Sequence, residues 1–188
     1  MDELLLARHG ESEASAGRIV GGDLPLTPVG REQARALGAG IASFPADICL
    51  TSGALRARET AAIALAGRDV KIEIVRDLGD VQFGDFDGQP LEKYRDWVAA
   101  HPPSEAAPGG ESRVDTLRRF AHAFRMLLAR TEQHVLVVAH GLTIRALLDE
   151  RPQPVVADAP YGQAVRLMHG ELQTAVERVE RWCKSPSW

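Results

Sequence analysis

Residues 134–148 read HVLVVAHGLTIRALL, and they indicate the fold class more clearly than any other part of the chain. The run VLVVA at 135–139 is short, apolar and rich in β-branched residues, so it predicts a buried strand. The apolar spacing of LTIRALL at 142–148 favours a helix directly after that strand. A strand followed at once by a helix is the repeating unit of an α/β fold. His140 and Gly141 lie at the junction between the two.

Short apolar runs predict two further strands at residues 4–7 and 47–51, and alternating apolar and polar residues predict a third at 70–75. Helical patterns separate these runs, so strands and helices alternate through most of the chain. This alternation predicts a three-layer α/β/α sandwich with a largely parallel central sheet. The tail at 164–179 is expected to add one or two more strands.

Two residues have the type expected of helix caps. Thr27 suits an N-cap, and Pro28 suits the first helical position after it. Ser52 is the expected cap of another helix, which Gly67 would end. Apolar residues at helical spacing predict a longer helix over 114–128.

The segments between these elements are rich in glycine, proline and serine. Residues 10–26, 79–90 and 101–112 are therefore expected to be loops, and a short helix is predicted over 91–100. None of them has the composition of a domain linker, so we expect one domain spanning residues 1–188.

Composition and charge exclude several classes of protein. Hydrophobic residues make up 45% of the chain and charged residues 26%, an ordinary balance for a globular domain. The net charge of −4 offers no extended basic field, so nucleic acid is not an expected partner.

The start of the sequence, MDELLLARHG, places two acids before a very short apolar run. It resembles neither a signal peptide nor a membrane span, so no membrane is expected.

The two cysteines, Cys49 and Cys183, lie far apart and lack metal-type spacing. Cys49 falls in an apolar run and is expected to be a buried thiol, which fits a reducing cytoplasm better than a disulfide scaffold. We therefore predict a cytoplasmic protein, and a homodimer is left open.

Charged side chains follow each of the four predicted strands. Arg8 and His9 follow the first, Arg56 lies one turn into the helix after the second, Asp80 follows the third and His140 the fourth. Ligands of open α/β sheets bind at the carboxyl ends of the strands. We therefore expect these side chains to gather at one edge.

Their chemistry suits transfer of a phosphoryl group. Arginines match phosphate oxygens with planar forks that stay charged, histidines supply a nucleophile and a donor, and a carboxyl group can protonate a leaving alcohol. The sequence contains no P-loop and no metal-type cluster, so we expect neither a metal nor a cofactor. Side chains and backbone amides would neutralise the phosphate.

Each of these residues taken singly is more often a surface or structural residue, so the hypothesis depends on their shared placement. The other four histidines lack that placement and are expected to be surface or structural residues: His101, His122, His134 and His169.

Six motifs, in order, resemble those of the histidine phosphatase superfamily, also called the phosphoglycerate mutase-like family. They are ARHGES at 7–12, DLPLTPVGREQARALG at 23–38, TSGALRARETA at 51–61, LGDVQFGDFDG at 78–88, PGGES at 108–112 and VLVVAHGLTIRALL at 135–148. The resemblance implies a phosphoglycerate mutase-like fold and a nucleophilic His9 that forms a phosphohistidine. It implies that Arg8, Arg56 and His140 bind the transferring oxygens.

The resemblance also identifies residues at which this chain departs from the family. Asp80 aligns with the proton donor, which is usually Glu, so the neighbouring acids Asp77, Asp85 and Asp87 are alternatives. Ser15 stands where many members have Asn, and its hydroxyl would take over that phosphate contact.

The implied function is metal-independent hydrolysis of a phosphomonoester of a small metabolite. A first alternative is a cofactor-dependent phosphoglycerate mutase, although the mutases have HGNS where this chain has HGLT at 140–143. A second is a non-catalytic phosphate-binding module, although the nucleophile and both arginines are intact. Within the family, the sequence most resembles the branch of α-ribazole phosphatases and broad-specificity phosphatases.

Specificity is expected to come from a lid-like insertion at about 86–112. Cationic side chains in and around it could contact an anionic substrate, although each taken alone is more often a solvated surface residue: Arg18, Lys93, Arg95 and Arg113.

Overall fold

The computed structural model describes residues 1–154 and 159–188, and its centre is a five-stranded sheet in the order β3-β2-β4-β1-β5. The strands span Glu3–Arg8 (β1), Ile48–Thr51 (β2), Lys71–Ile74 (β3), His134–Ala139 (β4) and Ala164–Met168 (β5). The first four pair in parallel, and β5 runs antiparallel to β1. The prediction of a largely parallel sheet is confirmed.

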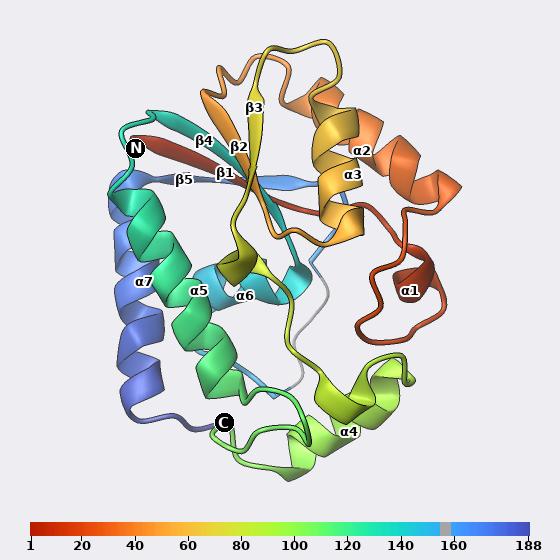
Figure 1. Cartoon of the computed structure of the whole chain (residues 1–188). Helices are drawn as coiled ribbons and strands as arrows, with labels where there is room; N and C mark the ends of the chain where they lie inside the picture. The colour runs from red at the N-terminus through yellow and green to blue at the C-terminus, as the bar shows by residue number, and fades with distance from the viewer. Residues whose placement is uncertain (155–158) are drawn as a thin grey trace.

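Helices cover both faces of this sheet (Figure 1). They span Glu13–Ala16 (α1), Pro28–Gly40 (α2), Leu55–Ala64 (α3), Leu91–Ala100 (α4), Arg113–Leu128 (α5), Gly141–Leu148 (α6) and His169–Lys184 (α7). Two short 3-10 turns lie at Arg76–Leu78 and Gly84–Phe86. Helices α2 and α3 pack on one face and α5, α6 and α7 on the other, which confirms the three-layer sandwich.

Strands β1, β2 and β4 are apolar on both sides because both of their faces are covered, whereas β3 and β5 at the edges of the sheet have most of their residues partly or fully exposed. Along β1, Leu4 and Leu6 point into the core beneath α5 and α7, whereas Leu5 and Ala7 point toward α2 and α3. A strand buried on both faces reads as a continuous apolar run rather than an alternating one. This explains why short apolar runs predicted β1, β2 and β4 correctly, whereas β3 was predicted from alternating apolar and polar residues.

The prediction for the tail was right for one strand and wrong beyond it. Residues 164–168 form β5, but 169–184 form α7 rather than another strand. Leu172, Val176 and Val179 are buried against the core at helical spacing. That apolar stripe, rather than local β propensity, decides the conformation of the segment.

Of the two predictions of helix caps, one is confirmed and the other is wrong. Thr27 caps α2 through its side chain, with Pro28 at the first helical position, as predicted. The expectation for Ser52 is wrong, because α3 begins after Ala54 without a side-chain cap. The helix also ends at Ala64 instead of running to Gly67. The hydroxyl of Ser52 is used instead in the site described below.

The segment around α4, predicted as a short helix over the same residues, lies at the bottom of Figure 1, apart from the main layers. Its side chains form a separate small core with Val20, Val81 and Ala107. The 10–26 segment, expected as a loop, contains α1, which Ser12 caps. Within residues 1–154 and 159–188, no helix is both long enough and apolar enough to cross a bilayer.

Candidate active site

Parallel pairing of β1 with β4 places the two predicted histidines side by side. The register aligns Arg8 with Ala139, so His9 and His140 are the first residues beyond the two strand ends. The His9 amide donates to the carbonyl of Ala139 at 3.0 Å, which continues the ladder by one bond. The imidazole centroids lie 5.2 Å apart at an interplanar angle of 64°.

The ring of His9 is buried and its orientation is fixed. Its Nδ1 lies 2.6 Å from the carbonyl oxygen of Gly10. Because a carbonyl only accepts, Nδ1 carries the proton and Nε2 carries the free electron pair. The Gly10 amide donates to the hydroxyl of Thr60 at 2.9 Å, which holds this turn in place. Burial lowers the pKa of His9 well below its ordinary value, and the electrostatic interactions with His140 and Arg56 lower it further, so the ring is neutral at pH 7.

Arg56 connects the groups of the site from the first turn of α3. Its Nε donates to His9 Nε2 at 3.3 Å, and its Nη2 lies 3.4 Å from Nδ1 of His140. The same Nη2 lies 3.3 Å from Oδ2 of Asp80, and Nη1 donates to the carbonyl of Gly22 at 2.9 Å. The guanidinium is therefore held beside the unprotonated nitrogen of His9.

His140 is buried beneath these groups. Its Nε2 lies 2.8 Å from the hydroxyl of Ser52, and its Nδ1 lies 3.5 Å from Oδ2 of Asp80. Burial lowers the pKa of His140 to about 4, although the carboxylate of Asp80 opposes the shift. The ring is therefore neutral at pH 7 and contributes hydrogen bonds rather than charge.

Of the acids weighed from the sequence, the structure brings Asp80 to the histidines. Burial raises its pKa, but the electrostatic interactions with His140 and with the cation of Arg56 outweigh burial, so the pKa of Asp80 lies below its ordinary value. Its side chain is 28% exposed and lines the cavity. Asp77 and Asp85 are not among the described lining residues, and Asp87 accepts from the amide of Gly22 at the outer rim.

Arg119 of α5 fixes the loop that carries Asp80, a role that no pattern in the sequence had indicated. Its Nη1 donates to the carbonyls of Asp77 and Gly79 at 2.9 and 2.8 Å, and its Nη2 to that of Asp80 at 2.9 Å. It also pairs with Glu111, which accepts from the amide of Gln82 at 2.9 Å. The PGGES motif was the one signal available, because it contains Glu111.

The other predicted phosphate ligands also reach the cavity. The guanidinium of Arg8 lies over the ring of Tyr161, 3.7 Å from its centroid, and donates to the carbonyl of Ala159. Ser15 lines the cavity from α1, with its hydroxyl 3.0 Å from that of Ser12. Sequence reasoning missed Tyr161, as well as Ser52 and Thr60 as partners of the histidine loops.

These groups open onto a cavity of about 370 Å³, which suits a small metabolite. Its lining combines charged residues of the site, such as Arg8, His9 and Arg56, with apolar and aromatic residues such as Phe83, Tyr94 and Leu142. Three of the four cationic side chains that the sequence predicted near the site line this cavity, and one does not. Arg18, Arg95 and Arg113 line the cavity, whereas Lys93 is exposed outside it.

The fold and the site together define a class of protein. Two guanidinium groups and two neutral imidazoles surround one small space at the carboxyl edge of a parallel sheet, which is an arrangement for binding and transferring a phosphoryl group. Residues 4–156 match the model of the histidine phosphatase superfamily (branch 1). The chain belongs to this superfamily, as the six motifs predicted.

Individual relatives of the chain are proteins named as phosphatases or as phosphoglycerate mutases. The chain is 31% identical over 185 residues to the uncharacterized phosphatase PhoE of Bacillus subtilis (strain 168), covering 97% of this chain and 92% of PhoE. It is 34% identical over 160 residues to an adenosylcobalamin/alpha-ribazole phosphatase of Salmonella typhimurium, with 77% of each chain covered. A phosphoglycerate mutase structure from Thermus thermophilus matches with a TM-score of 0.67 at 30% identity, covering 88% of this chain and 92% of that one. The predicted fold and phosphatase class are confirmed.

Proposed function

We propose that this phosphatase hydrolyses phosphomonoesters of small metabolites through a phosphohistidine on Nε2 of His9. The observation that carries the proposal is the state of that nitrogen. The Nδ1 proton is committed to the carbonyl of Gly10, and Nε2 presents its electron pair beside the guanidinium of Arg56. A neutral, oriented imidazole next to a cation is the arrangement that a nucleophile toward a phosphate dianion requires.

In the first step Nε2 of His9 forms a bond to phosphorus while the bond to the leaving alkoxide breaks. Arg8, Arg56, His140 and Ser15 would hold the equatorial oxygens, where charge accumulates in the transition state. Asp80 gives a proton to the leaving oxygen. In the second step Asp80 takes a proton from a water, the water attacks phosphorus, and the N–P bond breaks to return the free imidazole.

Asp80 must be protonated for the first step, although its pKa lies below the ordinary value. The lowering comes from the positive charge of Arg56 and from His140, which are the groups that would bind the phosphate. A phosphate dianion between them offsets this positive field and repels a second anion, so it raises the pKa of Asp80. We infer that substrate binding itself brings the acid into its working state.

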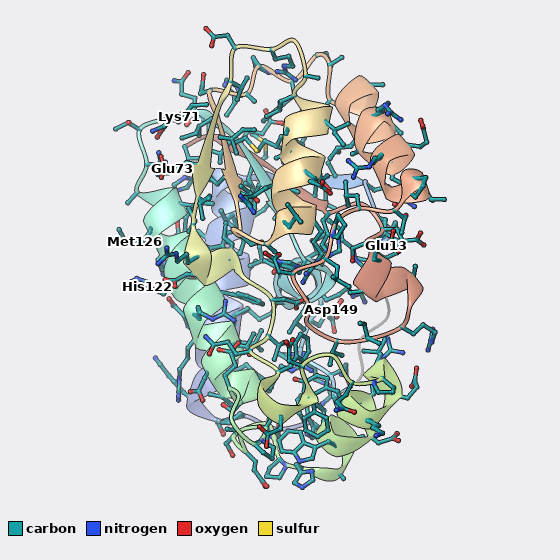
Figure 2. All side chains as sticks on the ribbon, turned by 45° about the vertical axis from the view of Figure 1, so that its right-hand side comes forward. Glu13, Lys71, Glu73, His122, Met126 and Asp149 are labelled. Atoms are coloured by element: carbon teal, nitrogen blue, oxygen red, sulfur yellow. The ribbon has the colours of Figure 1, made fainter. Side chains whose placement is uncertain are left out.

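Turnover of p-nitrophenyl phosphate tests the proposal. His9→Ala should abolish turnover, and brief incubation of the parent enzyme with labelled substrate should trap an acid-labile, base-stable phosphoenzyme. His122→Ala is the matched control, because His122 projects from the outer face of α5 (Figure 2). Parental turnover by the His9 variant would overturn the mechanism. We also expect a chelator to leave the rate unchanged, since arginines rather than a metal would neutralise the phosphate.

The mutase remains the second candidate, because mutases are among the proteins that this chain resembles. Conversion of 3-phosphoglycerate to 2-phosphoglycerate, primed with bisphosphoglycerate, distinguishes it from hydrolysis. Rapid turnover of any phosphomonoester would exclude the third candidate, a non-catalytic phosphate-binding module.

We further propose a single domain spanning the chain, with the 86–112 segment as a lid and no nucleic acid or membrane as partner. The cytoplasm is the proposed location, supported by two cysteines that are both buried free thiols, Cys49 and Cys183. Size-exclusion chromatography with light scattering would separate a monomer from a homodimer.

A further inference from the structure

The wall of the cavity contains a buried cation that has no acidic partner among the residues that the structure describes. Arg113, the first residue of α5, is 9% exposed and lines the cavity. Within the described residues, no carboxylate lies within ion-pair distance of it, and its Nε has no hydrogen-bond partner. Its remaining contacts are a long hydrogen bond from Nη2 to the carbonyl of Pro154 at 3.5 Å and the ring of Trp188, 6.0 Å away.

A second, partly buried arginine of the same helix shows what a structural role requires. Arg119, one and a half turns further along α5, pairs with Glu111 and donates to three backbone carbonyls. Arg113 has nothing comparable. Because burying an unpaired cation costs free energy, its position is best explained by a ligand that supplies the missing anion.

The neighbours of Arg113 show what kind of ligand would fit. Tyr94, Val98 and Leu142 line the same cavity, with Phe83 beside them. Burial raises the pKa of Tyr94 to about 12, so its hydroxyl stays protonated and can donate. Burial also lowers the pKa of Arg113 from its ordinary value, and the more distant charges of Asp80 and Glu111 oppose this shift without cancelling it.

We propose that Arg113 binds a second anionic group of the substrate, so that the preferred substrates are phosphomonoesters with an anion at each end. The proposal rests on the proposed function, since it places the scissile phosphate at His9. The second anion is a carboxylate or a further phosphate, both of which match a guanidinium fork. Apolar side chains of the cavity lining would contact the body of the metabolite.

Paired substrates test the proposal. The carboxylate arm compares 3-phosphoglycerate with glycerol 3-phosphate, in which a hydroxymethyl group replaces the carboxylate. The phosphate arm compares fructose 1,6-bisphosphate with fructose 6-phosphate. We expect kcat/KM to favour the doubly anionic member by about 10- to 100-fold in one arm, the usual range for a charged hydrogen bond to a buried group. The favoured arm identifies the second anion.

Three variants assign the preference to Arg113. Arg113→Met should lower that ratio to about 1, whereas Arg113→Lys should keep part of it because a charge remains. Arg118→Met is the control, since Arg118 is exposed on the same helix and should leave the ratio unchanged. A ratio near 1 for the parent in both arms would overturn the proposal. So would an equal loss on both members of a pair in Arg113→Met.

Thermal unfolding gives a readout besides activity. If Arg113 serves a ligand, Arg113→Met should unfold at or above the parental temperature, because an unpaired buried charge is replaced by an apolar chain of similar volume. A fall in Tm comparable to that of Arg119→Met would overturn the proposal in favour of a structural role. Failure of the proposed function is distinguishable, because it would show as p-nitrophenyl phosphate turnover that survives His9→Ala.

Discussion

The guanidinium of Arg56 and the carboxylate of Asp80 form an ion pair across the floor of the cavity, with Nη2 and Oδ2 3.3 Å apart. The proposed proton donor thus lies against the cation that would bind the substrate. A phosphate entering the site competes with Asp80 for the same N–H groups. The acid and the phosphate ligand are therefore coupled electrostatically, and changing either one alters the other.

Replacing the acid should separate proton donation from phosphate binding. Asp80→Asn should lower kcat for alkyl phosphates by roughly 100-fold or more, because their leaving groups need a proton. The loss should be much smaller for p-nitrophenyl phosphate, whose leaving group departs as an anion. Vanadate should bind the variant more tightly, since a competing negative charge is gone. Asp85→Asn is the control. Equal losses on both substrates would indicate that Asp80 is not the donor.

Arg119 should act as a positioning residue for Asp80. Arg119→Met would leave three carbonyls without their donor and the partly buried Glu111 without its ion-pair partner. We expect a stability loss of roughly 3–5 kcal/mol in urea unfolding. Displacement of the acid should also reduce kcat on alkyl phosphates more than on p-nitrophenyl phosphate. Unchanged selectivity between leaving groups would limit Arg119 to a purely structural role, and Arg118→Met controls for lost surface charge.

The sequence predicted the site residues that follow strand ends. It did not predict the residues that contact the site from distant parts of the chain. His9 and His140 are brought together by strand register alone, and Arg56 by the helix that directly follows β2, so local patterns were sufficient. Arg119 and Ser52 hold their targets through backbone carbonyls or a single hydroxyl, and such contacts leave no periodic or compositional signal. The segment forming α7 was misread because strand propensity was weighed above its apolar stripe.

Close packing behind His9, the proposed nucleophile, predicts a strong effect at one glycine of α2. A Cβ at Gly30 would lie 1.9 Å from the carbonyl oxygen of Glu11, in the turn that holds His9. Gly30→Ala should therefore cost at least about 2 kcal/mol of stability and reduce turnover by shifting that turn. Gly40, at the end of the same helix, has no atom within 4 Å of such a Cβ. Gly40→Ala should be neutral or stabilise by up to about 1 kcal/mol. Equal denaturation midpoints for the two variants would contradict the packing argument.

Burial of His140 predicts a specific loss of stability in mild acid. Its pKa is about 4 in the folded protein and about 6.5 in an unfolded chain, so the unfolded state binds the extra proton between these values. The free energy of unfolding should therefore fall as pH drops from about 6.5 toward 4, by roughly 3 kcal/mol from this group. Urea titrations of the parent and of His140→Gln measure the difference, and the variant should lose that part of the slope. His122→Gln, on the outer face of α5 (Figure 2), should retain it. Identical pH slopes for the parent and His140→Gln would mean that His140 is not held neutral by burial.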